Sequence, residues 1–325
     1  MTGASERGPA LLGDIGGTKS RFALLAAGGP VGAERTLADR DYASFADSLR
    51  AYLDAARPAV KPTRAALCFA CPVDGDRIVL TNYGWDFSLK ELARQFGFTR
   101  IEAINDFAAV ALSVPHLGAA DLQPIGAATA VASAGAPIGV IGPGTGLGMA
   151  GLVRCGAKWM ALPGEGGHAT MAAADEEEAS VLAHLRRRGD HVSAERVASG
   201  PGLGYLYCAL CELRGRAAAP PEPAEVAAGA IAGDDAEARD AARLFSVMFG
   251  TVAGNLALTL GARGGVYIAG GVILAMGPAF DRVRFRQRFE ARGRLSSYLA
   301  AIPTILVTHR APAFIGLAAL LRGTA

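Results

Sequence analysis

The sequence predicts an α/β protein with two related lobes. Short apolar runs typical of strands alternate with helix signals, which is the α/β pattern. An internal echo is the second observation: a glycine-rich turn between two apolar runs occurs at Gly13–Thr18 and again at Gly142–Gly148. The third is the length of 325 residues, which suits about two domains.

The first predicted lobe mixes strands with helices. Ser44 and Ser88 each stand three positions before an acidic residue, a pattern typical of a capped helix start. Gly97 and Pro115 end the second and third helices. The expected strands cover residues 10–15, 21–26, 65–70 and 100–104, and the expected helices cover 44–57, 88–97 and 106–114.

The second lobe opens with the same strand, turn and strand and becomes mostly helical after Pro163. Asp175–Arg188 has an acidic first turn and a basic last turn, as the helix dipole favours. Asp234–Gly261 is one long helix or two in tandem. The remaining expected elements are strands at 138–141, 149–154, 266–269 and 302–307 and a helix at 313–321. The predicted domains are residues 1–116 with 308–325, a small α/β domain, and residues 117–307, a large α+β domain.

Composition and charge exclude several classes of protein. With 51% hydrophobic and 19% charged residues the chain is globular, and a net charge of +2 is too small for nucleic-acid binding through phosphates. Leu122–Val153 and Leu244–Ala262 are uncharged and long enough to span a bilayer. Prolines and glycines interrupt the first and polar residues the second, so we expect two strands with a turn, and a buried core helix. No apolar signal segment opens the sequence, and we expect a cytoplasmic protein with no membrane partner.

Five cysteines include the pairs Cys68/Cys71 and Cys208/Cys211. The spacing within each pair could suit zinc, but the pairs are far apart in the sequence. Reduced, mostly buried thiols are the favoured interpretation over a structural zinc site.

The two glycine turns are candidate phosphate sites, because backbone N–H groups converge on an anion where no Cβ blocks the approach. Thr18 and Thr145 each add a hydroxyl donor, and Asp14 could hold Mg²⁺ through the water shell of the ion. Ordinary β-hairpins are the alternative, and the presence of two matched turns favours phosphate binding.

Two better-known phosphate motifs do not fit. Gly13–Ser20 nearly matches the P-loop, but Thr18 stands where that loop needs glycine and a strand follows instead of a helix. In Gly142–Gly148 the glycines fall at every second place, which is not the dinucleotide fingerprint.

Several polar residues are candidates for chemistry. Asp106 follows Asn105 where a strand becomes a helix, and either catalysis or helix capping would explain it. Glu165 and His168 stand among glycines with no core to fill, which suggests a ligand loop. Glu195 is a weaker candidate, because a lone helical glutamate usually lies on a solvated face.

Taken in order, these motifs resemble the bacterial-type glucokinases from about residue 10 to about residue 322. Lys19 departs from the pattern, since the close family usually has asparagine there. The form with lysine resembles a separate sugar-kinase family whose cysteine-rich zinc motif has no match here. The motifs that carry the resemblance are Gly13–Thr18, Ile104–Ala109, Gly142–Gly148, Leu162–His168, Glu195–Gly202 and Ile268–Val272, with Cys71-Pro72, Thr81-Asn82 and Trp85.

The resemblance implies a two-lobed actin-like ATPase fold, related to ribonuclease H, with an interlobe cleft. It implies ATP-dependent phosphorylation of D-glucose to glucose 6-phosphate with Mg²⁺, a homodimer, and Asp106 as general base. A kinase for another hexose or amino sugar, or a non-catalytic sugar sensor or actin-like protein, are the alternatives. The implied sugar ligands are Asn105, Asp106, Glu165, His168 and Glu195; the implied ATP contacts are Gly13, Asp14, Ile15, Gly16, Gly17, Thr18, Gly144, Thr145 and Gly146 for phosphate, with Gly270 and Gly271 near adenosine.

Overall fold

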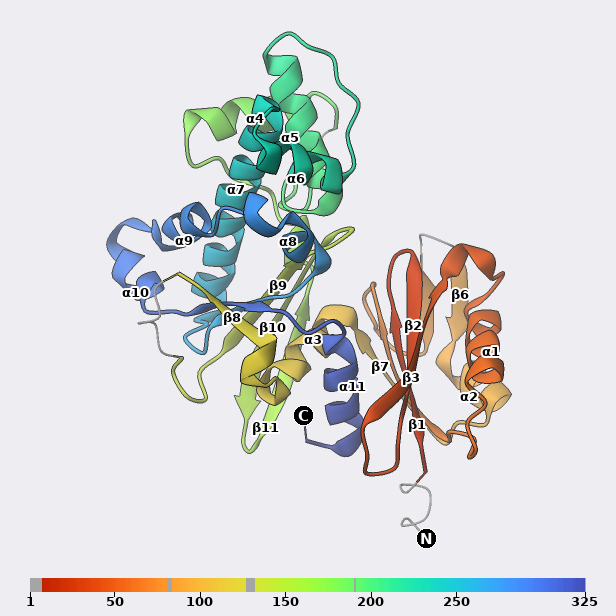
Figure 1. Cartoon of the computed structure of the whole chain (residues 1–325). Helices are drawn as coiled ribbons and strands as arrows, with labels where there is room; N and C mark the ends of the chain where they lie inside the picture. The colour runs from red at the N-terminus through yellow and green to blue at the C-terminus, as the bar shows by residue number, and fades with distance from the viewer. Residues whose placement is uncertain (1–7, 81–83, 127–131, 190, 325) are drawn as a thin grey trace. The chain divides into compact units, whose positions relative to one another are not determined.

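The computed structural model describes residues 8–80, 84–126, 132–189 and 191–324 (Figure 1). Thr81-Asn82 lies outside these residues. Contacts divide the chain into unit 1, which comprises Met1–Leu117, Cys155–Ala161 and Arg310–Ala325, and unit 2, which comprises Gly118–Arg154 and Leu162–His309. That the units fold as domains with boundaries at residues 116 and 307 stays a prediction.

Unit 1 contains a five-stranded sheet in the order β3-β2-β1-β4-β7. β1, β2 and β3 are antiparallel neighbours, whereas β4 runs parallel to β1 and β7 runs parallel to β4. The parallel strands meet in register at Ile15, Phe69 and Asn105, so their carboxyl ends share one edge of the sheet. The bounds are β1 Ala10–Ile15, β2 Lys19–Leu25, β3 Val31–Ala38, β4 Arg64–Phe69 and β7 Arg100–Asn105.

The helices of unit 1 begin and end at the predicted signals. The Ser44 side chain accepts from the Asp47 amide, the Ser88 side chain accepts from the Glu91 amide, and Gly97 adopts a left-handed φ of 74°. These capping predictions are confirmed. The helices are α1 Phe45–Ala56, α2 Leu89–Phe96, α3 Asp106–Ser113 and α11 Pro312–Arg322, and a hairpin of β5 Arg77–Leu80 and β6 Trp85–Ser88 lies outside the main sheet.

Two of these helices touch backbone to backbone. α11 packs on α3, β1 and β4, on the side of the sheet away from α1 (Figure 1). A Cβ atom at Gly316 of α11 would lie 1.9 Å from the backbone oxygen of Ala109 in α3. Only glycine fits at this contact, which fixes the position of the helix that begins with Asp106.

Unit 2 repeats the arrangement of unit 1. Its strands belong to a sheet of the order β11-β10-β9-β12-β13-β8, in which only Cys155 of β10 and the first four residues of β11 are assigned to unit 1. β9 pairs antiparallel with β10 and parallel with β12. The first five strands therefore follow the order of β3-β2-β1-β4-β7, which confirms the two related lobes predicted from the repeated turns. The bounds are β8 Leu122–Ile125, β9 Ile138–Pro143, β10 Leu147–Cys155, β11 Lys158–Gly164, β12 Val266–Ile268 and β13 Thr304–Val307.

The stretch Leu122–Val153 was expected to form two strands and a turn, but it carries β8 as well as β9 and most of β10. Residues 127–131 within it lie outside the described chain. β8 escaped prediction because it has only four residues, two of them exposed and polar or proline, and it pairs at the edge with β13.

The long apolar stretch of unit 2 is one continuous helix, α7, over Ala236–Leu260. It is the one described helix that is long and apolar enough to cross a membrane, but 78% of its most apolar window is buried inside the protein. The core-helix prediction is confirmed, and the alternative of two tandem helices is wrong. The other helices of unit 2 are α4 Glu176–Arg186, α5 Gly200–Leu213, α6 Pro223–Ala232, α8 Gly271–Met276, α9 Arg282–Glu290 and α10 Ser296–Ala300.

Candidate active site

One edge of the unit 1 sheet gathers the predicted phosphate turn and Asp106. β1 is followed by the turn Gly16–Thr18. β7, which is separated from β1 by β4, is followed directly by α3. Between them β4 ends at Phe69, and the Ala70 amide donates to the carbonyl oxygen of Ile15 at 2.9 Å. Ligand sites of open α/β sheets lie at such carboxyl edges.

The turn after β1 is tight. The Gly16 amide donates to the Lys19 carbonyl at 3.1 Å, and the Asp39 amide donates to the Thr18 carbonyl at 3.2 Å. Gly13 and Ile15 are buried in the sheet, and a Cβ at Gly13 would meet the Leu67 side chain at 2.7 Å. Packing therefore explains the glycine at position 13, while Gly17 and Thr18 are more accessible to an anion.

Asn105, and not Asp106, is the N-cap of α3. Its Oδ1 atom accepts from the amides of Phe107 at 2.9 Å and Ala108 at 3.2 Å, while its Nδ2 donates to the Cys71 carbonyl at 3.4 Å. Asp106 is the first helical residue and is half-buried, and its Oδ1 accepts from the Phe107 amide at 2.8 Å. The capping explanation for Asp106 is wrong, and the helix dipole favours its carboxylate there.

Glu195 stabilises the matching turn of unit 2 through a hydrogen bond. The Gly144 amide donates to the Gly146 carbonyl at 2.8 Å, and Glu195 Oε2 accepts from the Leu147 amide at 2.9 Å. Glu195 lies in a turn before α5 and is half-buried, so the solvated helix face suggested for it is wrong. Its Oε1 atom has no hydrogen bond to another described residue.

The loop with Glu165 and His168 packs onto β10 through its two glycines. A Cβ at Gly167 would lie 2.1 Å from the Leu147 carbonyl oxygen, and the Gly167 carbonyl accepts from the Glu195 amide at 2.8 Å. The side chains of Glu165 and His168 are exposed. Unit 2 therefore brings three predicted sugar ligands together beside its glycine turn.

A pocket of about 490 Å³ opens next to this turn. The start of α5 forms one wall, where the Gly200 amide donates to the Gly144 carbonyl at 2.9 Å. Val272, the residue after Gly271, lines the pocket. Gly270 does not line it: its φ is 127°, and a Cβ atom added there would lie 2.5 Å from the Pro143 carbonyl oxygen. The lining is Gly144, Thr145, Gly200, Pro201, Tyr205, Pro220, Pro221, Glu222, Pro223 and Val272.

The sequence analysis missed the α5 and proline walls of this pocket. No role was predicted for the run Pro220–Pro223, although Pro223 starts α6 and the run lines the pocket together with the start of α5. Three prolines in four residues were the sequence signal that could have indicated this wall, because each proline fixes its backbone φ angle and makes the segment rigid.

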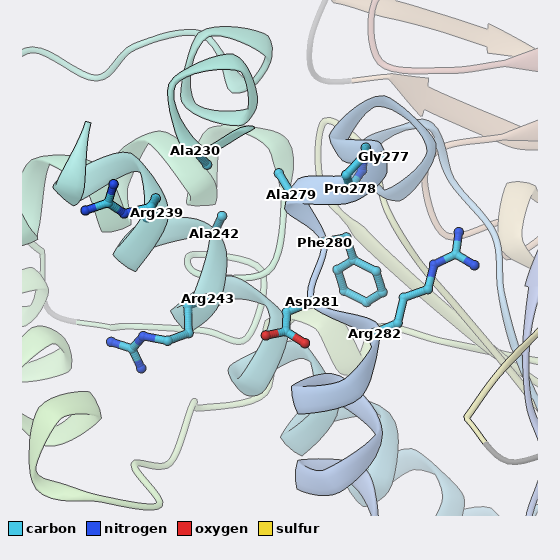
Figure 2. A pocket seen from close by; sticks show the side chains of 10 residues that line it. All are labelled: Ala230, Arg239, Ala242, Arg243, Gly277, Pro278, Ala279, Phe280, Asp281 and Arg282. Carbon is cyan, nitrogen blue, oxygen red and sulfur yellow. The ribbon is translucent and has the colours of Figure 1, made fainter. Parts of the chain in front are cut away.

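A second, larger pocket of about 680 Å³ lies elsewhere in unit 2, among α6, α7 and the start of α9 (Figure 2). None of the predicted site residues lines it. Arg239 and Arg282 extend from it in opposite directions, and Arg243 pairs with Glu177 at 2.5 Å. These arginines do not converge on one point, so we do not include this pocket in the site.

The thiols do not form a metal site among the residues described. None of the five cysteines forms a disulfide, and no three His, Cys, Asp or Glu side chains of the described chain cluster as metal ligands. Burial raises the pKa of the Cys68 thiol well above its usual value, and the carboxylates of Asp14 and Asp106 raise it further. A neutral thiol is a poor zinc ligand.

Gly146→Ala is a direct test of the link between Glu195 and the turn. The added Cβ would lie 2.4 Å from Glu195 Oε2, so the carboxylate must move. We expect an ATP analogue, the ligand predicted for the glycine turns, to bind about tenfold or more weakly, equivalent to one disrupted charged hydrogen bond, as measured by calorimetry. The control Gly118→Ala meets its nearest atom only at 3.6 Å and should behave as wild type; equal behaviour of both variants would contradict the link.

The repeated strand order, with a glycine turn after the first strand of each unit, defines the two-lobed actin-like ATPase fold. A solved glucokinase from an Antarctic psychrotroph has this fold, with a TM-score of 0.85, 37% identity, and coverage of 97% of this chain and 99% of that one. A solved ROK family glucokinase from Streptomyces griseus, in complex with glucose and AMPPNP, has a TM-score of 0.67 and 18% identity over 97% and 100% of the two chains, a likeness in fold.

A family model described as Glucokinase matches residues 11–324. The glucokinase of Aromatoleum aromaticum is 47% identical over 98% of this chain and 96% of the relative. The chain belongs to the glucokinase family.

Proposed function

We propose that this protein transfers the γ-phosphoryl group of ATP to the 6-hydroxyl of D-glucose, with Asp106 as general base. Membership of the glucokinase family over nearly the whole chain supports the reaction. One observation carries the role of Asp106: its half-buried carboxylate stands where β7 ends, at the same edge of the unit 1 sheet as the turn Gly16–Thr18, while Asn105 already caps α3.

In the proposed step the 6-hydroxyl oxygen forms a bond to the γ-phosphorus, and the bond from that phosphorus to the leaving ADP oxygen breaks. The carboxylate of Asp106 accepts the hydroxyl proton as the new bond forms. Backbone amides in Gly16–Thr18 and Gly144–Gly146 donate to the phosphate oxygens, where negative charge develops. These amides belong to turns already held by the rest of the fold, so they need little reorganisation.

The remaining sugar hydroxyls are assigned to side chains that keep free hydrogen-bonding capacity. Asn105 uses one of its two Nδ2 hydrogens toward Cys71, and Glu195 uses one oxygen toward Leu147. Glu165 and His168 are exposed and present their whole polar ends. Asn105 belongs to unit 1, and Glu165, His168 and Glu195 belong to unit 2.

Asp14 fits an indirect role toward Mg²⁺. Its side chain is 10% exposed, one oxygen pairs with Arg21 and the other lies 3.6 Å from the Cys68 sulfur. Mg²⁺ on ATP keeps several waters, and a carboxylate so engaged suits contact with those waters. When bound, the ion would neutralise charge on the transferring phosphoryl group.

A coupled assay tests the proposed function as a whole. We expect turnover with glucose and ATP that requires Mg²⁺, and lower kcat/KM for other hexoses and amino sugars. A higher value for another sugar would replace glucose as substrate. No turnover with any sugar, together with binding of glucose, would instead indicate a sensor.

Glu165→Gln and His168→Ala test the sugar loop. If both side chains bind hydroxyl groups, each change should weaken glucose binding by about 1–3 kcal/mol, the cost of an unpaired polar group. Calorimetry should show ATP binding without sugar nearly unchanged. The exposed controls Glu176→Gln and His116→Ala should leave both affinities unchanged; equal losses for glucose and ATP in the loop variants would mean that the loop is structural.

The proposal includes a homodimer, which rests on the family resemblance, and a location in the cytoplasm, as expected from the sequence. Light scattering on the purified protein is the measurement for the dimer, and a mass of one chain, 33.3 kDa, would contradict it.

A further inference from the structure

Arg21 pairs with Asp14 across the first hairpin. The two residues are direct partners in the register of β1 and β2, so their side chains lie on the same face of the sheet. The Arg21 Nη2 atom donates to Asp14 Oδ2, and its Nη1 atom donates to the carbonyl of Arg310 at 3.1 Å. One guanidinium group therefore joins the strand that enters the phosphate turn to the chain that enters α11.

Cys68 completes the surroundings of Asp14 on the other side. It is the partner of Asp14 in the register of β1 and β4, and its Sγ lies 3.6 Å from Asp14 Oδ1. Arg21, Asp14 and Cys68 thus form one row across three neighbouring strands, directly before the turn Gly16–Thr18. Both oxygens of the carboxylate have a protein partner.

This row restricts how the Asp14 carboxylate can turn. Because Asp14 as a whole residue is only 7% exposed, bulk solvent offers its carboxylate little alternative hydrogen bonding. A guanidinium group is planar and presents donors in fixed directions, and here a second donor is held by a backbone carbonyl. Lysine carries the same charge but has no such rigid fork, so it cannot reproduce both contacts in this geometry.

We propose that Arg21 is a positioning residue for magnesium-bound ATP: it sets the direction of the Asp14 carboxylate and ties the phosphate turn to the start of α11. This inference rests on the proposed function. Arg21 itself need not touch the nucleotide. Its effect is specific to nucleotide binding, because Asp14 and the turn, and not the sugar ligands, depend on it.

The experiment compares Arg21→Lys and Arg21→Met with Arg35→Met. Arg35 lies on β3 and donates to the Ala55 carbonyl at 3.5 Å, so it is a matched arginine away from the site. Calorimetry measures binding of AMPPNP with Mg²⁺ and with EDTA, and binding of glucose. Steady-state kinetics give kcat and KM for ATP and glucose separately, and thermal unfolding monitors the fold.

We expect both Arg21 variants to bind AMPPNP about tenfold or more weakly with Mg²⁺, the scale of one lost charge-assisted hydrogen bond. The loss with EDTA should be smaller, and glucose affinity should stay within about twofold of wild type, a change well under 1.4 kcal/mol. Arg35→Met should match wild type throughout. If Arg21→Met does not fold, Arg21→Lys, which keeps the charge, carries the comparison.

Wild-type AMPPNP affinity and KM for ATP in Arg21→Lys would overturn the inference while leaving the kinase function intact. Equal losses for glucose and AMPPNP would also overturn it, because a general structural role would then be sufficient. A wild-type protein that neither binds AMPPNP nor turns over ATP would overturn the proposed function and this inference together.

Discussion

Asp106→Asn is expected to lower kcat by about 10²-fold or more, while glucose still binds. Asparagine has the shape of aspartate and can still accept a hydrogen bond from the Phe107 amide, but it cannot take the proton of the 6-hydroxyl. The cap of α3 is unaffected, because Asn105 supplies it. Steady-state kinetics and glucose calorimetry on the same sample measure the two effects.

Two control variants separate the loss of the base from an effect on the helix. Asp54→Asn changes an exposed aspartate of α1 and should leave kcat unchanged. Asn105→Ala removes the cap and should cost about 1 kcal/mol of stability, which Asp106→Asn should not. A near-normal kcat in Asp106→Asn would contradict the assignment of Asp106 as general base.

Gly316→Ala is expected to cost about 3 kcal/mol or more of stability, at the upper end of the overpacking range. Alanine gains about 1 kcal/mol over glycine in a helix interior, but the added Cβ would lie 1.9 Å from the Ala109 backbone oxygen. Neither backbone can yield without moving α3 or α11. Because α3 begins with Asp106, we also expect kcat to fall, with the unfolding temperature and kcat measured together.

The control is Gly32→Ala on β3, in the same unit, where a Cβ would meet nothing within 4 Å. It should leave the unfolding temperature and kcat unchanged. A Gly316→Ala variant that is as stable as this control would show that the two helices do not touch as closely as described.

The repeated turns were the most informative part of the sequence. Glycines at Gly13–Thr18 and Gly142–Gly148 predicted two related lobes, and the shared strand order follows from that repeat. Local signals were equally reliable where one side chain decides the geometry, as with Ser44 and Gly97. β3 went unrecognised because most of its residues are exposed, so it lacks the apolar alternation that identifies a strand.

The site was harder to predict, because side chains of one type can have different tasks. Asn105 and Asp106 are consecutive polar residues, and only the backbone shows which of them caps the helix. Glu195 was predicted among the weakest ligands, yet it supports the glycine turn through the Leu147 amide, a contact 48 residues apart. The pairing of Arg21 with Asp14 depends on strand register, which the sequence pattern did not specify.

The contact of α11 with α3 also has a consequence for how the chain is made. The two helices are separated by about 200 residues, and at roughly 5–20 residues per second a ribosome needs about 10–40 s to synthesise that interval. During this time α3 has emerged without α11, the helix that covers it. Its apolar residues, among them Val110 and Leu112, are buried in the finished protein. We therefore expect the apolar face of α3 to stay uncovered until α11 has been synthesised, an interval in which exposed apolar surface favours aggregation.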